Sequence, residues 1–575
     1  CLPCRARHRQ ARQADPTRRI LDSHRQPPDA LPGLAPGILS LAVAVPSVTV
    51  PTMNFPRFGT EKGTHAGPRG SHRHVALGAL RLLIIAASLA TNAGASELHI
   101  GAASVDITPT LPVALCGQFN LRIATTAETP LTANVLALES REQDRTLDLA
   151  IMVSCDLVGI PDEMLKMVRQ EVRRQLPEVD TRKLFLNATH THTAPVLDNA
   201  PGSSFLYPIP KDGVLQPEEY VRFFVGRVSG AIVEAWNTRR PGSVTWGLSH
   251  AVVACNRRTV YSQRLPTPGA FGDGTARMYG DTRVPEFRNL EGMEDHDLNV
   301  LFFWDEAGKL SATIVHVPCT AQLVEGRSSV NADYWHPVRE KLRQRFGPEL
   351  VVLGVIGAAG DQSPRPLYRG AAEERMTRLR GLSGLDEIAR RIVVAVEEAY
   401  NTVKEDRHAD APLIHKVDIL SLPLRLVTQD EYAFSKAEQD KYAAQIAADP
   451  KSADDVLTRM TWNRHVVERF ERQQNTPHPQ RDVELHVLRI GDATICTCEF
   501  ELFTDYGIRI QARSKALQTL VVQLVGNGSY LPTEKAVQGG GYSAVIQSTE
   551  IGPEGGQMLV DRTVALIDGL FPSTK

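Results

Sequence analysis

Short apolar runs separated by turn residues recur along the chain from about residue 96 onward. Runs of this length with turn residues on either side favour buried strands over helices. They predict strands at 147–154, 183–188, 244–254, 350–356, 483–490, 493–498 and 520–525. Two further runs, at 298–304 and 310–317, flank a turn at Gly308 and predict a β-hairpin.

Amphipathic segments alternate with the apolar runs. Met164, Val168 and Val172 recur every four residues, so we expect a helix over 161–176. Similar segments predict helices at 217–236, 333–346, 371–402 and 428–475, and from about residue 504.

The alternation predicts the fold class. Neither an internal repeat nor a linker interrupts it after residue 96. Residues 262–296 are rich in Gly, Pro, Asp and Glu and are predicted to be loop. We therefore expect an α/β fold in which mixed β-sheets flanked by helices form a single large domain at 96–575.

The first 95 residues lack this alternation. Residues 1–52 are rich in Arg, Pro, Gln and Ala, and we expect a disordered tail or a spurious extension of the reading frame. Residues 53–95 show the order of a signal peptide: a basic stretch, an apolar core at 82–90 and small residues at 93–95. That core is shorter than the roughly 20 residues that span a bilayer. We expect a periplasmic or secreted protein without a transmembrane segment in its mature chain.

The charge of the chain divides in the same place. The formal net charge is -2, but residues 1–95 carry twelve basic and four acidic side chains, and residues 96–575 carry 52 basic and 62 acidic ones. A domain that binds nucleic acid more often has a basic folded part. The basic run at 5–25 keeps a nucleic-acid arm as the alternative to a tail, yet we expect no nucleic-acid partner.

Four cysteines share an apolar setting. Cys155, Cys319, Cys496 and Cys498 lie in strand-like runs and are predicted to be small buried hydrophobic residues. One or two disulfides would also be compatible with export, but the sequence does not select a pairing.

Side chains able to do chemistry follow several predicted strands. In His190-x-His192 an extended backbone would direct both imidazoles to one face, which suits a metal ion or a polarised substrate. An incidental pair is the alternative. His316 lies on a buried strand, where a hydrogen-bonded core histidine is the alternative to a ligand. Glu501 precedes a helix, where it could simply offset the helix dipole.

Glycine-containing loops add further candidates. The turn at 357–364 presents Ser363, but the chain has neither a GxSxG elbow nor a GK[ST] phosphate loop there. Tyr530 and Tyr542 lie on Gly-rich loops, where ordinary turn chemistry is the alternative. Because α/β proteins bind ligands at the carboxyl ends of their strands, the joint appearance of these residues indicates a ligand site.

The chain resembles the neutral/alkaline (non-lysosomal) ceramidases in five motifs and over about residues 98–570. The motifs are Thr189-His190-Thr191-His192, the strand with His316, Gly360-Asp361-Gln362-Ser363-Pro364, Glu501-Leu502-Phe503-Thr504 and the Tyr530/Tyr542 pair. The segments Val105–Pro109 and Val153–Asp156 also resemble that family.

This resemblance implies a zinc-dependent hydrolase that cleaves the N-acyl amide of ceramide-like lipids with a zinc-activated water. The implied Zn²⁺ ligands are His190, His316, Glu501 and Tyr530. The implied catalytic residues are His192, Arg257 and Tyr542 around the scissile carbonyl, and Ser363 as the family's active-site serine. Asp156 would orient a ligand histidine. The implied partner is a small-molecule or lipid substrate, which a membrane surface could present.

Departures from the family leave the substrate open. The family's immunoglobulin-like C-terminal domain is not expected here. Thr193-Ala194-Pro195-Val196-Leu197 replaces Ser-Gly-Pro-Gly-Gly after the histidines, and Gln362 and Arg365 replace Val and Asn. Two alternatives therefore remain. The same zinc site could act on a non-lipid amide, an ester or a carbohydrate, or the chain could be a non-catalytic secreted binding protein with a relic site.

Overall fold

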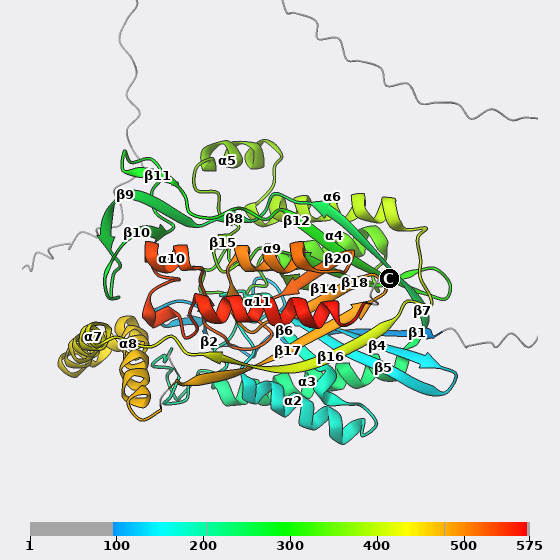
Figure 1. Ribbon diagram of the computed structural model, residues 1–575, viewed down its shortest axis with the longest axis horizontal. Coiled ribbons are helices and arrows are strands. Elements are labelled where there is room, and N and C mark those ends of the chain that lie inside the picture. The colour runs from blue at the N-terminus through cyan, green and yellow to red at the C-terminus, as the bar shows by residue number, and fades with distance from the viewer. Residues whose placement is uncertain (1–95, 204, 477, 572–575) are drawn as a thin grey trace, which may run out of the picture. The chain divides into compact units, whose positions relative to one another are not determined.

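Two β-sheets form the centre of the computed structural model, which describes residues 96–203, 205–476 and 478–571 (Figure 1). The larger sheet contains β1 (Glu97–Asp106), β4 (Thr132–Glu142), β5 (Arg145–Cys155), β6 (Leu184–Ala188), β7 (Arg240–His250), β12 (Asp297–Asp305), β13 (Leu310–Val317) and β14 (Val351–Ile356). The smaller sheet contains β16 (Leu413–Pro423), β17 (Gln480–Ile490), β18 (Ala493–Thr497) and β20 (Gln518–Val522). The predicted extension at 1–52 and signal peptide region at 53–95 lie outside the described residues.

Both sheets are mixed. The strand orders are β14-β13-β12-β7-β1-β4-β5-β6 and β16-β17-β18-β20. Parallel pairs form at β13–β14 and β5–β6 in the larger sheet and at β18–β20 in the smaller one, and the other neighbours are antiparallel. The polypeptide thus delivers several strand ends, and the loops that follow them, to one region.

Helices cover the outer face of each sheet. The larger sheet is covered by α2 (Asp162–Gln175), α3 (Pro217–Thr238), α4 (Trp335–Phe346) and α6 (Gly384–Val403). The smaller sheet is covered by α9 (Thr504–Arg513) and α11 (Pro553–Asp568). Between the sheets, apolar side chains such as Leu136 of β4 and Leu488 of β17 share one core. The predicted single α/β domain with mixed sheets flanked by helices is confirmed.

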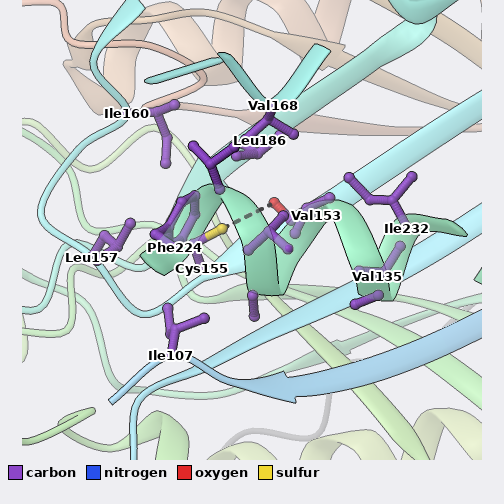
Figure 2. Close-up of a cluster of buried hydrophobic side chains, with 14 of the residues drawn as sticks. Ile107, Val135, Val153, Cys155, Leu157, Ile160, Val168, Leu186, Phe224 and Ile232 are labelled. Carbon is purple, nitrogen blue, oxygen red and sulfur yellow. Dashed lines mark hydrogen bonds between the residues drawn. The ribbon is translucent and has the colours of Figure 1, made fainter. Parts of the chain in front are cut away.

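Strand alternation explains why the larger sheet has two apolar faces. Val135 points to the helices and its neighbour Leu136 to the other sheet, because successive strand side chains point to opposite faces. Figure 2 shows the helix-side cluster, in which Cys155 lies near Val153 and Phe224. The predicted burial of Cys155 is confirmed, and Cys319, Cys496 and Cys498 are buried as well. Each apolar side chain of Leu or Phe size fully buried here contributes about 1.5–3 kcal/mol.

Most predicted elements are present, with two corrections. The hairpin prediction is confirmed by β12 and β13, and α4 matches its predicted range. The predicted helix at 371–402 is two helices, α5 (Gly370–Leu379) and α6, separated by a turn. The segment 262–296, predicted to be loop, is loop only in part, because β9 (Arg258–Pro266), β10 (Asp273–Met278) and β11 (Phe287–Leu290) form a sheet there. Its strands are bulged and half exposed, so they lack an alternating apolar pattern.

The predicted helical segment at 428–475 is an antiparallel helix pair. It consists of α7 (Gln429–Ala448) and α8 (Ala453–Gln473), which lie to one side of the sheets in Figure 1. Thr428 and Glu431 form a capping box that fixes the start of α7. Shorter elements complete the described chain: β2 (Val113–Leu115), β3 (Arg122–Ala124), β8 (Cys255–Asn256), β15 (Gln362–Ser363), β19 (Glu501–Leu502), β21 (Tyr530–Leu531) and α10 (Glu534–Gly539). Across 96–571, leaving aside residues 204 and 477, no helix has the length and apolarity to cross a bilayer.

A buried histidine pair lies in the smaller sheet, and one of its members, His415, contacts the larger sheet through Nδ1, 3.2 Å from the carbonyl of Leu149 on β5. His415 Nε2 on β16 lies 3.0 Å from His486 Nδ1 on β17, and His486 Nε2 lies 2.9 Å from Glu484 Oε1. Burial lowers the pKa of both imidazoles, that of His415 well below its ordinary value. Below about pH 6.5 the unfolded chain therefore binds more protons than the folded one. Because both imidazoles are buried in their neutral form, they do not reduce the free energy of unfolding at neutral pH. That free energy falls as the pH drops below about 6.5.

We expect His415→Gln to make the unfolding free energy less dependent on pH. Each proton that only the unfolded chain takes up steepens the dependence by as much as about 1.4 kcal/mol per pH unit, and the variant removes one such proton. Urea titrations followed by tryptophan fluorescence at pH 7.5, 6.5 and 5.5 measure this slope. His250→Gln, at an exposed histidine, is the matched control. Equal slopes in wild type and His415→Gln would contradict the prediction.

Candidate active site

Five short segments bring the predicted site residues to one place. His190 follows β6, Arg257 follows β8, and Ser363 lies in β15, which pairs with β8. Glu501 in β19 pairs directly with Tyr530 in β21. A Cβ on Gly360 would collide with the backbone carbonyl of Glu501, so only glycine allows these loops to pack this closely.

His190 and Glu501 face each other at the centre. His190 has a φ of 62°, so the HxH segment is not the extended strand that the sequence suggested. His190 Nδ1 donates to the carbonyl of Val158 at 2.6 Å, which leaves Nε2 without a proton. That Nε2 atom lies 3.4 Å from Glu501 Oε2 and 3.4 Å from His192 Nε2. The two imidazole rings are 4.8 Å apart and edge-on.

Arg257 places a positive charge against this pair. Its buried guanidinium donates to the carbonyl of Gly360 at 2.9 Å and to the Tyr530 hydroxyl at 3.2 Å, and it lies 3.6 Å from Glu501 Oε2. Burial opposes the charge, but Tyr530, Tyr279 and Glu501 outweigh it and raise the pKa of Arg257. Its Nε is buried without a hydrogen-bond partner among the described residues. Arg257 is thus a permanently charged donor at the centre of the cluster.

His192 is held as a neutral imidazole. Burial, followed by the charges of His190 and Arg122, lowers the pKa of His192 well below its ordinary value. The amide nitrogen of Gln322 lies 2.7 Å from His192 Nε2, so we assign the proton of the ring to Nδ1, 3.5 Å from Glu325 Oε2. Arg122 donates to the carbonyl of His192 at 2.6 Å and so holds this loop in place.

Ser363 contacts the centre of the cluster through another side chain. Its hydroxyl accepts hydrogen bonds from the Tyr279 hydroxyl at 3.3 Å and from the backbone N–H of Arg365 at 3.2 Å. The Tyr279 hydroxyl in turn lies 3.3 Å from Arg257 Nη1. Ser363 therefore reaches the cluster through Tyr279.

Tyr530 and Tyr542 form the aromatic side of the cluster around Arg257. Their ring centroids are 5.8 Å apart, and Tyr542 lies 5.7 Å from Trp462 of α8 and 5.7 Å from Phe119. Burial raises the pKa of both phenols, so each keeps its proton at neutral pH. The helix pair α7–α8 thus contributes an aromatic wall beside the polar centre.

The expected place of His316 needs a correction. His316 Nε2 donates to the carbonyl of Val521 at 2.9 Å, and Nδ1 lies 3.4 Å from Asn299 Nδ2. Alternation along β13 directs His316, like Ile314, into the layer between the two sheets. His316 is therefore a hydrogen-bonded core histidine and does not join His190, Glu501 and Tyr530.

Asp156 also acts differently from the expectation. Its carboxylate accepts from Arg339 at 2.7 and 3.0 Å and from the Thr189 hydroxyl at 3.2 Å. The ring of His190 is oriented by the Val158 carbonyl instead. Asp156 thus fixes the residue before His190 and not the imidazole itself.

Three site residues were missed by sequence reasoning. Gln322 contacts His192, and its Oε1 lies 3.1 Å from Arg257 Nη1. Tyr279 contacts Arg257 and Ser363. Glu325 lies between His192 and Arg365. Gln322 follows β13, so the rule that directed attention to strand ends could have found it. Tyr279 lies in the segment that was predicted to be loop and carried no such signal.

Two of the four expected zinc ligands lie at the spacing that a zinc ion requires. No group of three or more His, Cys, Asp or Glu side chains within the described part of the chain could hold a metal ion. His190 Nε2 and Glu501 Oε2 do fit, because two ligands of a tetrahedral zinc stand about 3.3 Å apart. Glu501 Oε2 is buried without a hydrogen-bond partner in the described structure, and Tyr530 lies opposite Glu501 in the β19–β21 pair. His190, Glu501 and Tyr530 are therefore the members of the expected ligand set that lie together.

Comparisons with known proteins concern the fold. No family model matches the chain, and no curated protein matches its sequence. The crystal structure of neutral ceramidase from Pseudomonas aeruginosa matches with a TM-score of 0.56 and 16% identity, covering 84% of this chain and 76% of that one. A structure described as ceramidase complexed with C2 matches with a TM-score of 0.57, 16% identity and the same coverage.

The fold and the site together define an α/β protein with a buried polar centre at its strand ends. Over most of the chain the fold is ceramidase-like. At 16% identity this likeness describes the path of the backbone, so the activity has to be argued from the side chains.

Proposed function

We propose that the chain is an exported zinc-dependent hydrolase of linear amides that cleaves the N-acyl amide of ceramide-like lipids. The observation that carries the proposal is the meeting of His190, Glu501 and Arg257 at one buried point of a ceramidase-like fold. A carboxylate, an unprotonated imidazole nitrogen and a charged guanidinium at this spacing suit the hydrolysis of a carbonyl compound.

His190, Glu501 and Tyr530 would hold the zinc ion. A bound zinc ion supplies Lewis acidity, which polarises a carbonyl and lowers the pKa of a water to about 7. The Val158 carbonyl keeps the proton of His190 on Nδ1, so Nε2 is ready to bind a cation. Glu501 brings the negative charge that a buried cation requires.

Arg257 would stabilise the developing oxyanion. Its Nε has no partner among the described residues, and the remaining nitrogens are already held by Gly360, Tyr530, Gln322 and Tyr279. A fixed donor of this kind needs no reorganisation during the reaction. Tyr542 keeps its proton at neutral pH and is a candidate donor to the leaving amine. His192, held neutral by burial, would orient the substrate carbonyl beside them.

We expect purified protein to contain zinc and to hydrolyse a fluorescent N-acylsphingosine, and Arg257→Lys to reduce kcat. Lysine keeps the charge but cannot direct a donor at the oxyanion while also satisfying the four partners of Arg257, so the loss should be about 10²–10³-fold, as for other oxyanion donors. Metal analysis and steady-state kinetics measure both. Arg283→Lys, at an exposed arginine, should match wild type. Protein that contains no zinc and hydrolyses no amide would contradict the proposal and favour the relic binding protein.

A polar substrate remains the second candidate. Gln322, Glu325 and Arg365 make the side of the site around His192 polar, in contrast to the aromatic side around Tyr542. Polar groups of this kind would recognise hydroxyl or amide groups of a substrate. Testing a short N-acyl amino acid, an acetyl ester and an N-acetylated sugar beside the N-acylsphingosine would distinguish these substrates by kcat/KM.

A further inference from the structure

Helix α5 and the residue before it expose apolar side chains on the surface. Tyr368, just before the helix, together with Met376 and Leu379 forms one stripe along it, and these side chains are 59%, 39% and 62% exposed. No residue of α5 is buried. In a helix of a soluble domain the apolar stripe normally faces the core. Here it faces away from the sheets, and Figure 1 shows α5 at the periphery beyond α6.

Ion pairs of Glu373 hold α5 against the body. Glu373 pairs with Arg369 at 3.0 Å and with Arg391 of α6. Just after α5, Arg380 pairs with Glu387 of α6 at 3.1 Å. These ion pairs tether α5 while its apolar stripe stays outside.

A cavity of about 760 Å³ lies between α5, α6 and the loop that follows Ser363. Its lining combines apolar residues (Leu323, Pro364, Pro366, Leu382 and Ile388) with charged ones (Arg365, Arg369, Glu373, Glu374, Arg378, Glu387 and Arg391). Leu323 follows Gln322, and Pro364 follows Ser363, so the cavity adjoins the candidate active site. Apolar atoms make up most of the cavity surface, so a hydrocarbon chain can lie there while the charged side chains contact a polar headgroup.

Unpaired arginines indicate which partner the stripe would meet. Arg375 lies in the stripe and Arg378 beside it, and neither forms an ion pair with any described residue. Glu374 is the exposed acidic residue nearby. Exposed apolar side chains combined with free arginines suit the interface of an anionic membrane, where arginine contacts lipid headgroups and the apolar side chains enter the acyl boundary.

We propose that α5 docks the protein onto anionic lipid membranes through Tyr368, Met376 and Leu379, with Arg375 and Arg378 contacting the headgroups. The choice of a lipid partner rests on the proposed function. Docking would place the cavity at the membrane surface, where a lipid chain could enter it on the way to the active site.

Flotation with vesicles of phosphatidylcholine, with and without 30 mol% phosphatidylglycerol, tests the proposal. Wild type should bind the anionic vesicles. Arg375→Gln/Arg378→Gln should bind them roughly 30-fold more weakly, since each arginine near such a surface contributes about 1 kcal/mol. Met376→Gln/Leu379→Gln should weaken binding at least about tenfold. Leu517→Gln and Ile419→Gln, at exposed apolar residues elsewhere, should bind like wild type.

Three outcomes would overturn the proposal: no binding by wild type, equal binding by all variants, or a dimer that only Met376→Gln/Leu379→Gln dissociates. Hydrolysis of a short-chain, water-soluble N-acylsphingosine without vesicles keeps the two proposals distinguishable. If the protein hydrolyses this substrate but does not float with the vesicles, only the membrane-docking proposal is contradicted. If it floats without hydrolysing the substrate, only the amidase proposal is contradicted.

Discussion

Replacing His190 with glutamine should lower hydrolysis of an N-acylsphingosine by about a thousandfold, or roughly 4 kcal/mol in transition-state stabilisation, and should remove the zinc. His316→Gln should leave zinc content and kcat close to wild type. The difference follows from their surroundings. His190 Nε2 faces the unpartnered oxygen of Glu501, whereas both nitrogens of His316 are occupied between the sheets.

The two variants form a matched pair, because each replaces a buried histidine with a residue of similar size. In His316→Gln the amide can still donate to the Val521 carbonyl, so we expect a stability loss of about 1 kcal/mol and little else. Metal analysis, kinetics and urea unfolding on both proteins separate metal loss from unfolding. Loss of zinc in His316→Gln with retention in His190→Gln would show that the metal site lies elsewhere.

The main layers of the fold could be predicted from the sequence because their signals are local. The apolar run of β5 indicates a strand buried on both faces, and the four-residue period of α2 indicates a helix with one buried face. The sheet of β9, β10 and β11 escaped prediction because it is bulged and half exposed. The break between α5 and α6 also carries few apolar residues, so periodicity could not locate it.

The site was harder to predict because pairing across distant segments decides it. Strand ends correctly directed attention to His190 and Glu501, yet only the pairing of β19 with β21 sets Glu501 beside Tyr530. His316 lies on a buried strand near the same edge, but the face to which β13 turns it depends on β20 packing above. Gln322 lies on a loop whose course depends on Arg122, which donates to the carbonyl of Glu325 at 2.7 Å.

A buried ion pair beneath His190 connects the stability of the domain to its site. Asp156 ends β5 and is fully buried, and Arg339 of α4 holds its carboxylate with two hydrogen bonds. The backbone N–H of Thr132 donates to the same carboxylate at 2.9 Å, and the Thr189 hydroxyl at 3.2 Å. The pair thus ties α4 and β4 to the residue that precedes His190.

Asp156→Asn should destabilise the domain by about 3–5 kcal/mol, because it leaves the Arg339 guanidinium buried without a counter-charge. The double variant Asp156→Leu/Arg339→Met should lose less than this, since it removes both charges together. Urea unfolding gives the free energies, and Asp281→Asn, in an exposed ion pair, should leave the midpoint unchanged. A double variant no more stable than Asp156→Asn would mean that the threonine contacts of Asp156, and not its charge, carry its effect. In that case zinc binding at His190 should also weaken in Thr189→Val, which removes the hydroxyl and keeps the shape.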